Sequence, residues 1–203
     1  MDQLIEKLRS NNIQCYVTNN REEAQRIALE LIPQGALIAM GNSLTLREVG
    51  IFEVIAKGNY NFINQFETGI SASENLKRRK AGLMADVYVT STNAITYEGE
   101  LVNIDGKGNR VAAMMFGPDK VIVIVGENKI VKDREEAWTR LKEKTAPELA
   151  KKLGRATPCA TTGKCSNCSS PDRICRFYTI IGGQMPGDKD RIHVILVREH
   201  LGI

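Results

Sequence analysis

The strongest constraint on the fold is a series of short apolar runs that alternate with segments of helical character. The runs Ala36–Met40, Val121–Val125 and Val194–Val197 have no charged residue and are typical of strands that are buried on both faces. Helical segments with capping residues separate such runs along the chain. This alternation predicts an α/β fold with a mostly parallel sheet and helices on both of its faces.

The predicted elements cover one domain, residues 1–203, without a repeat or a linker. We expect helices over 2–11, from caps at 18–20 to about 32, from the turn at 41–48 to about 58, from Ser71 or Ser73 to Ala85, and over 133–153 with an interruption at Pro147. We expect strands over 13–17, 36–40, 62–66, 86–90, 121–125, 177–181 and 192–197, with small strands around Leu101 and Val111.

Charge and composition argue against several classes of protein. The net charge is only +4 and aromatic residues make up 5%, whereas nucleic-acid-binding proteins are typically strongly basic and use stacking aromatic side chains. No apolar run approaches the roughly 20 residues that cross a bilayer. The first residues include Asp2, Glu6, Lys7 and Arg9 rather than the apolar centre of a signal peptide. We therefore expect a cytoplasmic protein with reduced thiols.

The segment Gly-Asn-Ser-Leu-Thr-Leu-Arg-Glu at 41–48 directly follows a predicted buried strand. Ligands of open α/β sheets bind beyond the carboxyl ends of strands, where this segment is expected to lie. Its turn-forming, hydrogen-bonding and charged candidates are Gly41, Asn42, Ser43, Thr45 and Arg47. They predict a site for a phosphate or carboxylate, and the alternative is a plain strand–turn–helix connection with Ser43 as N-cap.

A second polar segment, from Thr90 to Arg110, also begins at the end of a predicted strand. Many small hydrogen-bonding residues are typical of a backbone that lies close to a ligand. The candidate ligand-binding residues are Thr90, Asn93, Asn103, Gly106 and Asn109. Glu98 and Asp105 are the candidate acid–base residues. Tyr97-Glu98-Gly99 and Asp105-Gly106 also fit ordinary hairpin turns, which is the alternative interpretation.

Lys129 follows the apolar run Val121–Val125 in the turn Gly-Glu-Asn-Lys. If the sheet is parallel, the three strand-end segments converge, and Lys129 can neutralise an acidic ligand. An exposed turn lysine is the alternative. The chain has no G-x-x-x-x-G-K-[ST] motif, and Gly106-Lys107-Gly108 lacks the third glycine of the dinucleotide fingerprint. We therefore do not expect ATP or NAD to bind through these motifs.

Four of the five cysteines form the pattern C-x5-C-x2-C-x6-C, at Cys159, Cys165, Cys168 and Cys175. Four thiolates at this spacing predict a metal centre in a cysteine-rich loop at about 157–176. The spacing matches neither a zinc ribbon nor the bacterial ferredoxin run, so zinc, an iron–sulfur cluster and free thiols stay open. Cys15, on a predicted strand, is interpreted as a buried apolar residue.

Three blocks of the sequence resemble the lactate-utilisation (LUD) domain family, of LutC/YkgG-like type. They are Met40-Gly-Asn-Ser-Leu-Thr-Leu-Arg-Glu48, residues 86–111 from Asp-Val-Tyr-Val-Thr to Gly-Asn-Arg-Val, and Gly126-Glu-Asn-Lys-Ile-Val131. The blocks follow the family order and span nearly the whole chain. The cysteine segment departs from the shorter lactate-utilisation subunits.

The resemblance implies a three-layer α/β sandwich of the NagB/RpiA/CoA-transferase-like type. In that group, strand-end loops bind sugar phosphates, CoA esters or folates, and the matching positions here are 41–47, 90–96, 103–110 and 126–129. The family name implies participation in the oxidation of L-lactate to pyruvate together with iron–sulfur partner subunits.

Three functions from different classes follow. The first is a subunit or accessory protein of an organic-acid (lactate-type) oxidising system, with an iron–sulfur cluster on the cysteines. The second is a stand-alone isomerase or acyl/CoA-transferase-like enzyme that uses Glu98 or Asp105. The third is a binding module with a structural zinc ion. We expect a small anionic metabolite as ligand and no nucleic-acid partner, and a homo-oligomer stays open.

Overall fold

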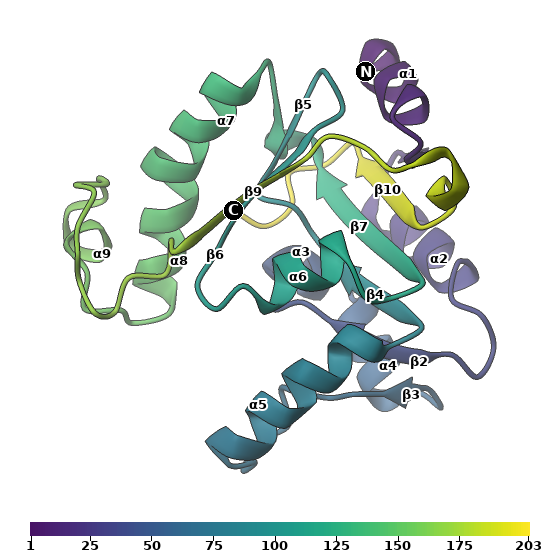
Figure 1. Ribbon diagram of the computed structural model, residues 1–203, viewed down its shortest axis with the longest axis horizontal. Coiled ribbons are helices and arrows are strands. Elements are labelled where there is room, and N and C mark those ends of the chain that lie inside the picture. The colour runs from purple at the N-terminus through teal and green to yellow at the C-terminus, as the bar shows by residue number, and fades with distance from the viewer.

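Ten strands form two sheets in the structure, a computed structural model that describes residues 1–203 (Figure 1). The strands are β1 (Gln14–Thr18), β2 (Leu37–Met40), β3 (Asn61–Phe62), β4 (Val87–Thr90), β5 (Ala94–Thr96), β6 (Leu101–Asp105), β7 (Lys120–Gly126), β8 (Ile130–Val131), β9 (Phe177–Ile181) and β10 (Ile192–Val197).

The helices lie between these strands in the chain. The α-helices are α1 (Asp2–Ser10), α2 (Arg21–Glu30), α3 (Leu44–Glu48), α4 (Ile51–Lys57), α5 (Ala72–Ala81), α6 (Asn109–Met115), α7 (Arg134–Arg140), α8 (Ala146–Lys152) and α9 (Pro158–Thr162). Short 3-10 turns form η1 (Gly82–Met84), η2 (Glu127–Lys129) and η4 (Pro186–Asp188), and η3 (Leu141–Thr145) is a π-helical turn. None of the helices is both long and apolar enough to cross a bilayer.

The central sheet has the strand order β1-β10-β7-β4-β2-β3, and every neighbouring pair is parallel. Its middle strands β4, β7 and β10 are almost entirely buried, because apolar side chains point to both faces. Ile122 and Ile124 pack with α2, α3 and α4 on one face, while Val121, Val123 and Val125 pack on the other. The prediction of a mostly parallel α/β fold is confirmed.

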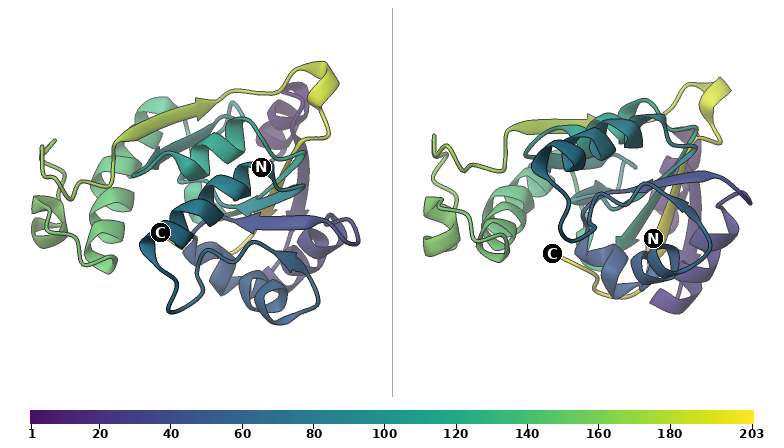
Figure 2. Two further views of the ribbon diagram at one scale, coloured as in Figure 1. Left: turned by 60° about the horizontal axis from the view of Figure 1, so that its bottom comes forward. Right: turned by 90° about the horizontal axis from the view of Figure 1, so that it is seen from below.

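A second sheet, in the order β8-β5-β6-β9, covers the other face of the central sheet together with α1 and α6 (Figure 2). Here β6 pairs antiparallel with β5 and β9, and β8 pairs parallel with β5. Helix α7 packs on its outer face through Ala137. The arrangement fits a three-layer α/β fold in which a small sheet replaces part of one helical layer.

The predicted strand around Val111 is wrong, since this residue lies in α6. Gly108 adopts a φ of +80° immediately before the helix, which turns the chain out of the preceding strand. The Asp105 carboxylate then accepts hydrogen bonds from the backbone N–H groups of Arg110 and Val111. These local contacts start a helix in which Val111 points into the core.

Three further boundaries differ from the prediction. The expected strand 62–66 is only the two-residue β3. The expected helix after residue 41 is divided into α3 and α4, because Gly50 adopts a left-handed φ of +77°. The expected break at Pro147 is absent, since the π-helical turn η3 joins α7 to α8 and places Pro147 directly after this wider turn, at the second position of α8.

The cysteine-rich segment lies at one end of the molecule. Helices α8 and α9 and the loop that follows them project from the left edge of Figure 1, and both views of Figure 2 place them at the same end. The segment is not wholly a loop, because α9 contains Cys159.

Candidate functional site

The strand-end segments of the central sheet converge around a cavity of about 440 Å³. Its walls come from the turn after β2, the segment after β4, the end of β6 with the start of α6, and η2. Residues of η3 and α8 contribute as well, together with Gln65, Arg79, Arg155, Ile174, Gly202 and Ile203. The predicted convergence of the three loops therefore occurs, because parallel strands place their carboxyl ends at one edge of the sheet.

Eight of the residues singled out in the sequence line this cavity. They are Asn42, Ser43, Thr45, Asn93, Asp105, Gly106, Asn109 and Lys129. Gly41, Thr90 and Asn103 lie behind them as supports, and Arg47 lies elsewhere. The sequence prediction thus placed most of the candidate residues on a common surface, although their roles stay predictions.

Lys129 is the most unusual residue of the site, because its side chain is only 4% exposed and contacts no carboxylate. The Nζ atom lies 2.8 Å from Thr45 Oγ1 and 3.0 Å from Ser91 Oγ. Thr45 lies in α3, which follows β2, and Ser91 directly follows β4, so Lys129 connects all three strand-end segments. The interpretation as an exposed turn lysine is wrong.

Burial lowers the pKa of Lys129 from 10.5 to about 7, because an ammonium group loses most of its hydration there. The positive charges of Arg140 and Arg110 lower this pKa further, while the carboxylate of Glu48 opposes them. A substantial fraction of the amine is therefore neutral near neutral pH. Perturbed lysines of this kind occur frequently at functional sites.

Gly202 covers the amine from the side of the chain that follows β10. It adopts a φ of +67°, and a Cβ atom at this position would lie 2.5 Å from Thr45 Oγ1 and 3.3 Å from Lys129 Nζ. Its backbone N–H donates to Glu48. Close backbone approach here requires glycine, and it limits access of water to Lys129.

Arg110 fixes the inner wall of the cavity with its guanidinium group. Nη1 donates to the Ser91 carbonyl and to Asn103 Oδ1, and Nη2 donates to Asn93 Oδ1 and to the Ile104 carbonyl, at 2.7–3.0 Å. None of these acceptors is a carboxylate. Arg110 therefore contributes a fixed positive charge, and most of its donors are already used within the chain.

The supporting residues hold Arg110 and its neighbours in place. The amide oxygen of the fully buried Asn103 accepts from Arg110, Thr92 and the backbone of Asn93. A Cβ atom at Gly41 would lie 2.7 Å from Thr90 Oγ1, so only glycine allows the turn after β2 to pack against β4. Arg47, in contrast, stacks on the Phe52 ring at 4.3 Å and does not line the cavity.

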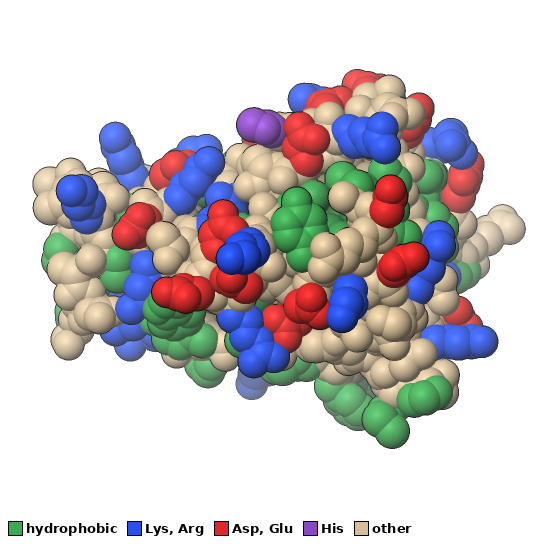
Figure 3. Space-filling model, turned by 90° about the horizontal axis from the view of Figure 1, so that it is seen from above, with side chains coloured by type: hydrophobic (Ala, Val, Ile, Leu, Met, Phe, Trp, Pro, Cys, Tyr) green, Lys and Arg blue, Asp and Glu red, His purple; other side chains and the backbone are tan.

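The cavity lining carries an excess of positive charge. Five basic side chains contribute to it, namely Arg79, Lys107, Arg110, Lys129 and Arg155, against the single acidic side chain of Asp105. Asp105 is already engaged by three backbone N–H groups. On the face in Figure 3, by contrast, basic and acidic side chains are interspersed. The structure concentrates positive charge in the cavity, which is complementary to an anion.

Three polar atoms of the lining are buried without a hydrogen-bond partner in the chain. They are the two donors Nε of Arg79 and Oγ1 of Thr145, and one acceptor, Oε1 of Gln65. Buried polar groups are normally hydrogen-bonded, so unpaired donors at a cavity wall are available to a ligand. The side-chain amides of Asn42 and Asn109 also make no hydrogen bond within the chain, since both lie at the solvent-accessible part of the lining.

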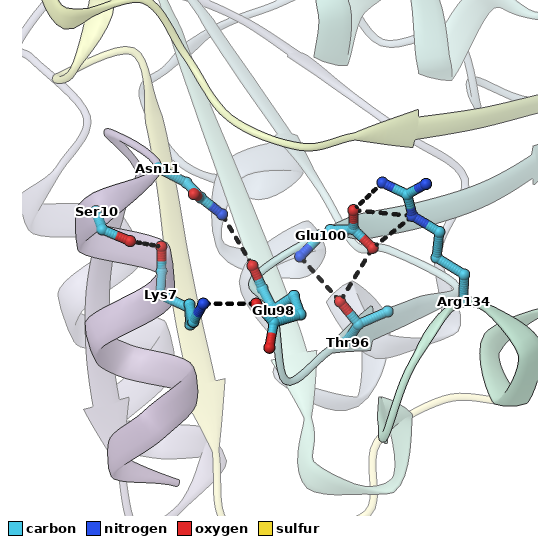
Figure 4. A network of polar contacts seen from close by, with 7 residues as sticks. All are labelled: Lys7, Ser10, Asn11, Thr96, Glu98, Glu100 and Arg134. Atoms are coloured by element: carbon cyan, nitrogen blue, oxygen red, sulfur yellow. Dashed lines mark hydrogen bonds and ion pairs between the residues drawn. The ribbon is translucent and has the colours of Figure 1, made fainter.

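Glu98, one of the two predicted acid–base residues, is not part of the cavity. It sits in the turn between β5 and β6, where its carboxylate pairs with Lys7 Nζ at 2.6 Å and its carbonyl accepts from Asn11 (Figure 4). The turn therefore docks on α1, which favours the hairpin interpretation of this segment. Asp105 alone of the two lies at the cavity.

The four clustered cysteines are all free thiols, and the chain brings no three metal-ligating side chains together. Cys159 lies in α9 beside Thr157, while Cys175 Sγ accepts from Arg173 Nε at 3.2 Å. This arrangement does not fit a zinc ion or an iron–sulfur cluster without rearrangement. The four-cysteine metal centre stays a prediction from the sequence.

Several residues of the site were not singled out in the sequence. Ser91 and Arg110 lay within the matched loops 90–96 and 103–110 but had no role of their own, and Arg79, together with Arg140 outside the lining, was not singled out. Their importance depends on contacts between distant elements, such as the hydrogen bond from Arg140 to the carbonyl of Ile203. A basic residue one turn after a glycine-rich strand end was the available signal for Arg110.

Comparison with known proteins gives a family match and a similar fold. A family model described as LUD domain matches residues 1–197. No curated protein matches the chain. The crystal structure of a DUF162 family protein from Deinococcus radiodurans is similar, with a TM-score of 0.55 and 16% identity over 97% of this chain and 94% of that chain. At this identity, the similarity shows the fold alone.

Proposed function

The chain belongs to the LUD domain family, and we propose that its strand-end cavity binds a small organic anion as part of an organic-acid (lactate-type) oxidising system. In this proposal the chain holds the organic acid, and iron–sulfur partner subunits carry the electrons, as the family resemblance implies. The finer fold assignment, to the NagB/RpiA/CoA-transferase-like type, belongs to the same proposal. Strand-end loops bind the ligand in that type of fold, and the cavity lies at the corresponding edge.

The observation that carries the proposal is the buried amine of Lys129 in a cavity with excess positive charge. A buried cation without a counter-ion is costly, and here neither Lys129 nor the guanidinium of Arg110 forms an ion pair. A bound carboxylate or phosphate would supply the missing negative charge. The volume of about 440 Å³ suits a small metabolite.

Calorimetric titration with small carboxylates, hydroxy acids and phosphates tests this proposal. We expect binding by the unmodified chain and at least a tenfold loss of affinity in Lys129→Met, because the variant removes the central charge. Lys132→Met is the matched control, since Lys132 is 82% exposed and pairs only with Asp133. Equal affinities of all three proteins, or no binding of any anion, would contradict the proposal.

A stand-alone enzyme that acts on a small anion is the second candidate. The lowered pKa of Lys129 favours it, because a neutral buried amine can take part in proton transfer or addition near neutral pH. Asp105 can act as an acid or base, as predicted, only if its carboxylate gives up the hydrogen bonds that it accepts from three backbone N–H groups. Turnover of a bound anion by the isolated chain, without partner subunits, would favour this candidate.

A further inference from the structure

We propose that the Lys129 amine forms a reversible imine with the carbonyl group of a small organic anion, namely an aldehyde or ketone that bears a carboxylate or phosphate. This inference deepens the proposed function and rests on it, because the same cavity holds the ligand. It adds a covalent step and a requirement for a carbonyl group. Buried lysines with few charged partners are the side chains that typically carry out such chemistry.

The surroundings of Lys129 favour the neutral amine that imine formation requires. The charged groups that face it are Arg110 from α6, Arg140 from α7 and Glu48 from α3. The two arginines repel an ammonium group. The Lys129 amine contacts only the two hydroxyls, while the Glu48 carboxylate accepts a hydrogen bond from the backbone of Gly202. Burial acts in the same direction and brings the pKa to about 7.

The hydroxyl groups of Thr45 and Ser91 can form hydrogen bonds with both the ammonium and the neutral form of Lys129. Thr45 Oγ1 donates to the Leu201 carbonyl at 3.4 Å, and Ser91 Oγ donates to the Thr92 carbonyl at 3.3 Å. Both bonds are long, so either hydroxyl can turn and donate to the lone pair of a neutral amine at little cost. The same hydroxyls, at 2.8 and 3.0 Å from Nζ, are placed to relay protons during the reaction.

The covalent step balances without an oxidant or reductant. The lone pair of Nζ attacks the carbonyl carbon, the C–N bond forms, and the π electrons of the C=O bond move to oxygen. That oxygen takes up a proton as the nitrogen loses one, which gives a carbinolamine. Uptake of one further proton and loss of water give the protonated imine. Hydrolysis reverses these steps and restores the amine.

Other groups of the lining can hold the anionic part of such a ligand. The Arg79 Nε–H is buried without a partner, and the Asn42 and Asn109 amides make no hydrogen bond within the chain. These donors can bind a carboxylate or phosphate while its carbonyl carbon faces Lys129. The backbone of Gly202 lies against the amine on one side, and Lys129 faces the cavity on another.

Reductive trapping tests the proposal on the full chain. The protein is incubated with glyoxylate or pyruvate near pH 8, reduced with cyanoborohydride, and examined by intact mass and peptide mapping. We expect one adduct per chain, on Lys129, formed at least tenfold faster than adducts on exposed lysines. An excess of phosphate should slow labelling of Lys129 and leave labelling of Lys132 unchanged.

Lys129→Arg should abolish the adduct, and Lys132→Arg should retain it. Circular dichroism and thermal unfolding show whether the Lys129 variant is folded, and mapping of the unmodified chain decides the site in any case. Labelling confined to exposed lysines, with anion binding retained in calorimetry, would overturn the imine and leave the proposed anion site intact. If the unmodified chain neither binds a small anion nor is labelled at Lys129, the proposed function is contradicted as well.

Discussion

Lys129 and Arg110 are both buried basic side chains of one cavity, and their surroundings affect their charges differently. Arg110 keeps its charge because four oxygen acceptors surround a rigid guanidinium group. Lys129 has only two hydroxyl acceptors, and an ammonium group sheds a proton far more readily than a guanidinium. Arg110 therefore gives the cavity a constant positive charge, whereas the charge of Lys129 depends on its surroundings.

The pKa of Lys129 makes stability depend on pH. Between about pH 7 and 10 the unfolded chain binds a proton that the native chain does not, so the free energy of unfolding rises with pH. Below about pH 7 the amine is protonated in both states, and the native chain bears the full cost of burying its charge. We expect the free energy of unfolding of the natural chain to rise relative to that of Lys129→Met by up to about 1.4 kcal/mol per pH unit. Urea denaturation at several pH values measures this, and parallel profiles would refute it.

Arg110→Lys should destabilise the chain, because one ammonium group cannot replace four planar donor bonds. We expect a loss of about 3 kcal/mol, as for other broken buried charge networks, together with weaker anion binding. Arg26→Lys is the control, since Arg26 forms an exposed pair with Glu30 and should change stability by less than about 0.5 kcal/mol. A loss for Arg110→Lys no larger than that of the control would show that the four bonds are unimportant.

Helix α6 is the element that brings Arg110 to the cavity, and its start depends on backbone geometry. Gly108 turns the chain with a positive φ, and Asp105 accepts from the first N–H groups of the helix. Neither feature appears in the apolar pattern of the sequence. This is why Val111 was predicted in a strand, whereas the buried strands β2, β4, β7 and β10 were predicted from their apolar runs.

Gly108→Ala tests this start. A Cβ atom at Gly108 would lie 3.4 Å from the Phe177 ring, an ordinary contact, so the cost comes from the backbone alone. We expect a loss of about 1 kcal/mol in thermal or chemical unfolding. Gly187→Ala is the matched control, because Gly187 has open space and no positive φ. Equal stability of the two variants would contradict the account of α6.

In the whole molecule, the parallel order of the central sheet accounts for most of the candidate site. Convergence of the loops at 41–48, 90–93 and 126–129 could be predicted, because it follows from strand direction alone. The second sheet could not, since β5 has only three residues, and the sheet is completed by β8 and β9, which pair with β5 and β6 from positions distant in the sequence. Glu98 lies outside the predicted site, because the turn between β5 and β6 packs against α1.

The peripheral position of the cysteine segment leads to a prediction for the whole chain. With free thiols, replacing Cys165 and Cys168 by serine should cost less than about 1 kcal/mol, since neither side chain is fully buried. Metal and sulfide analysis of anaerobically purified protein accompanies the unfolding measurement. A loss of several kcal/mol, with loss of bound zinc or iron, would instead reveal the metal centre that the cysteine spacing predicts.

The central claim is that the buried amine of Lys129 belongs to an anion-binding site. Isotope-edited NMR titration of the lysine side chains, assigned with Lys129→Arg, tests it most directly. We predict a pKa near 7 for Lys129 and a clear rise when a carbonyl-free anion such as phosphate saturates the cavity, because bound negative charge stabilises the ammonium form. A pKa close to the ordinary 10.5, or one that no small anion changes, would contradict the claim.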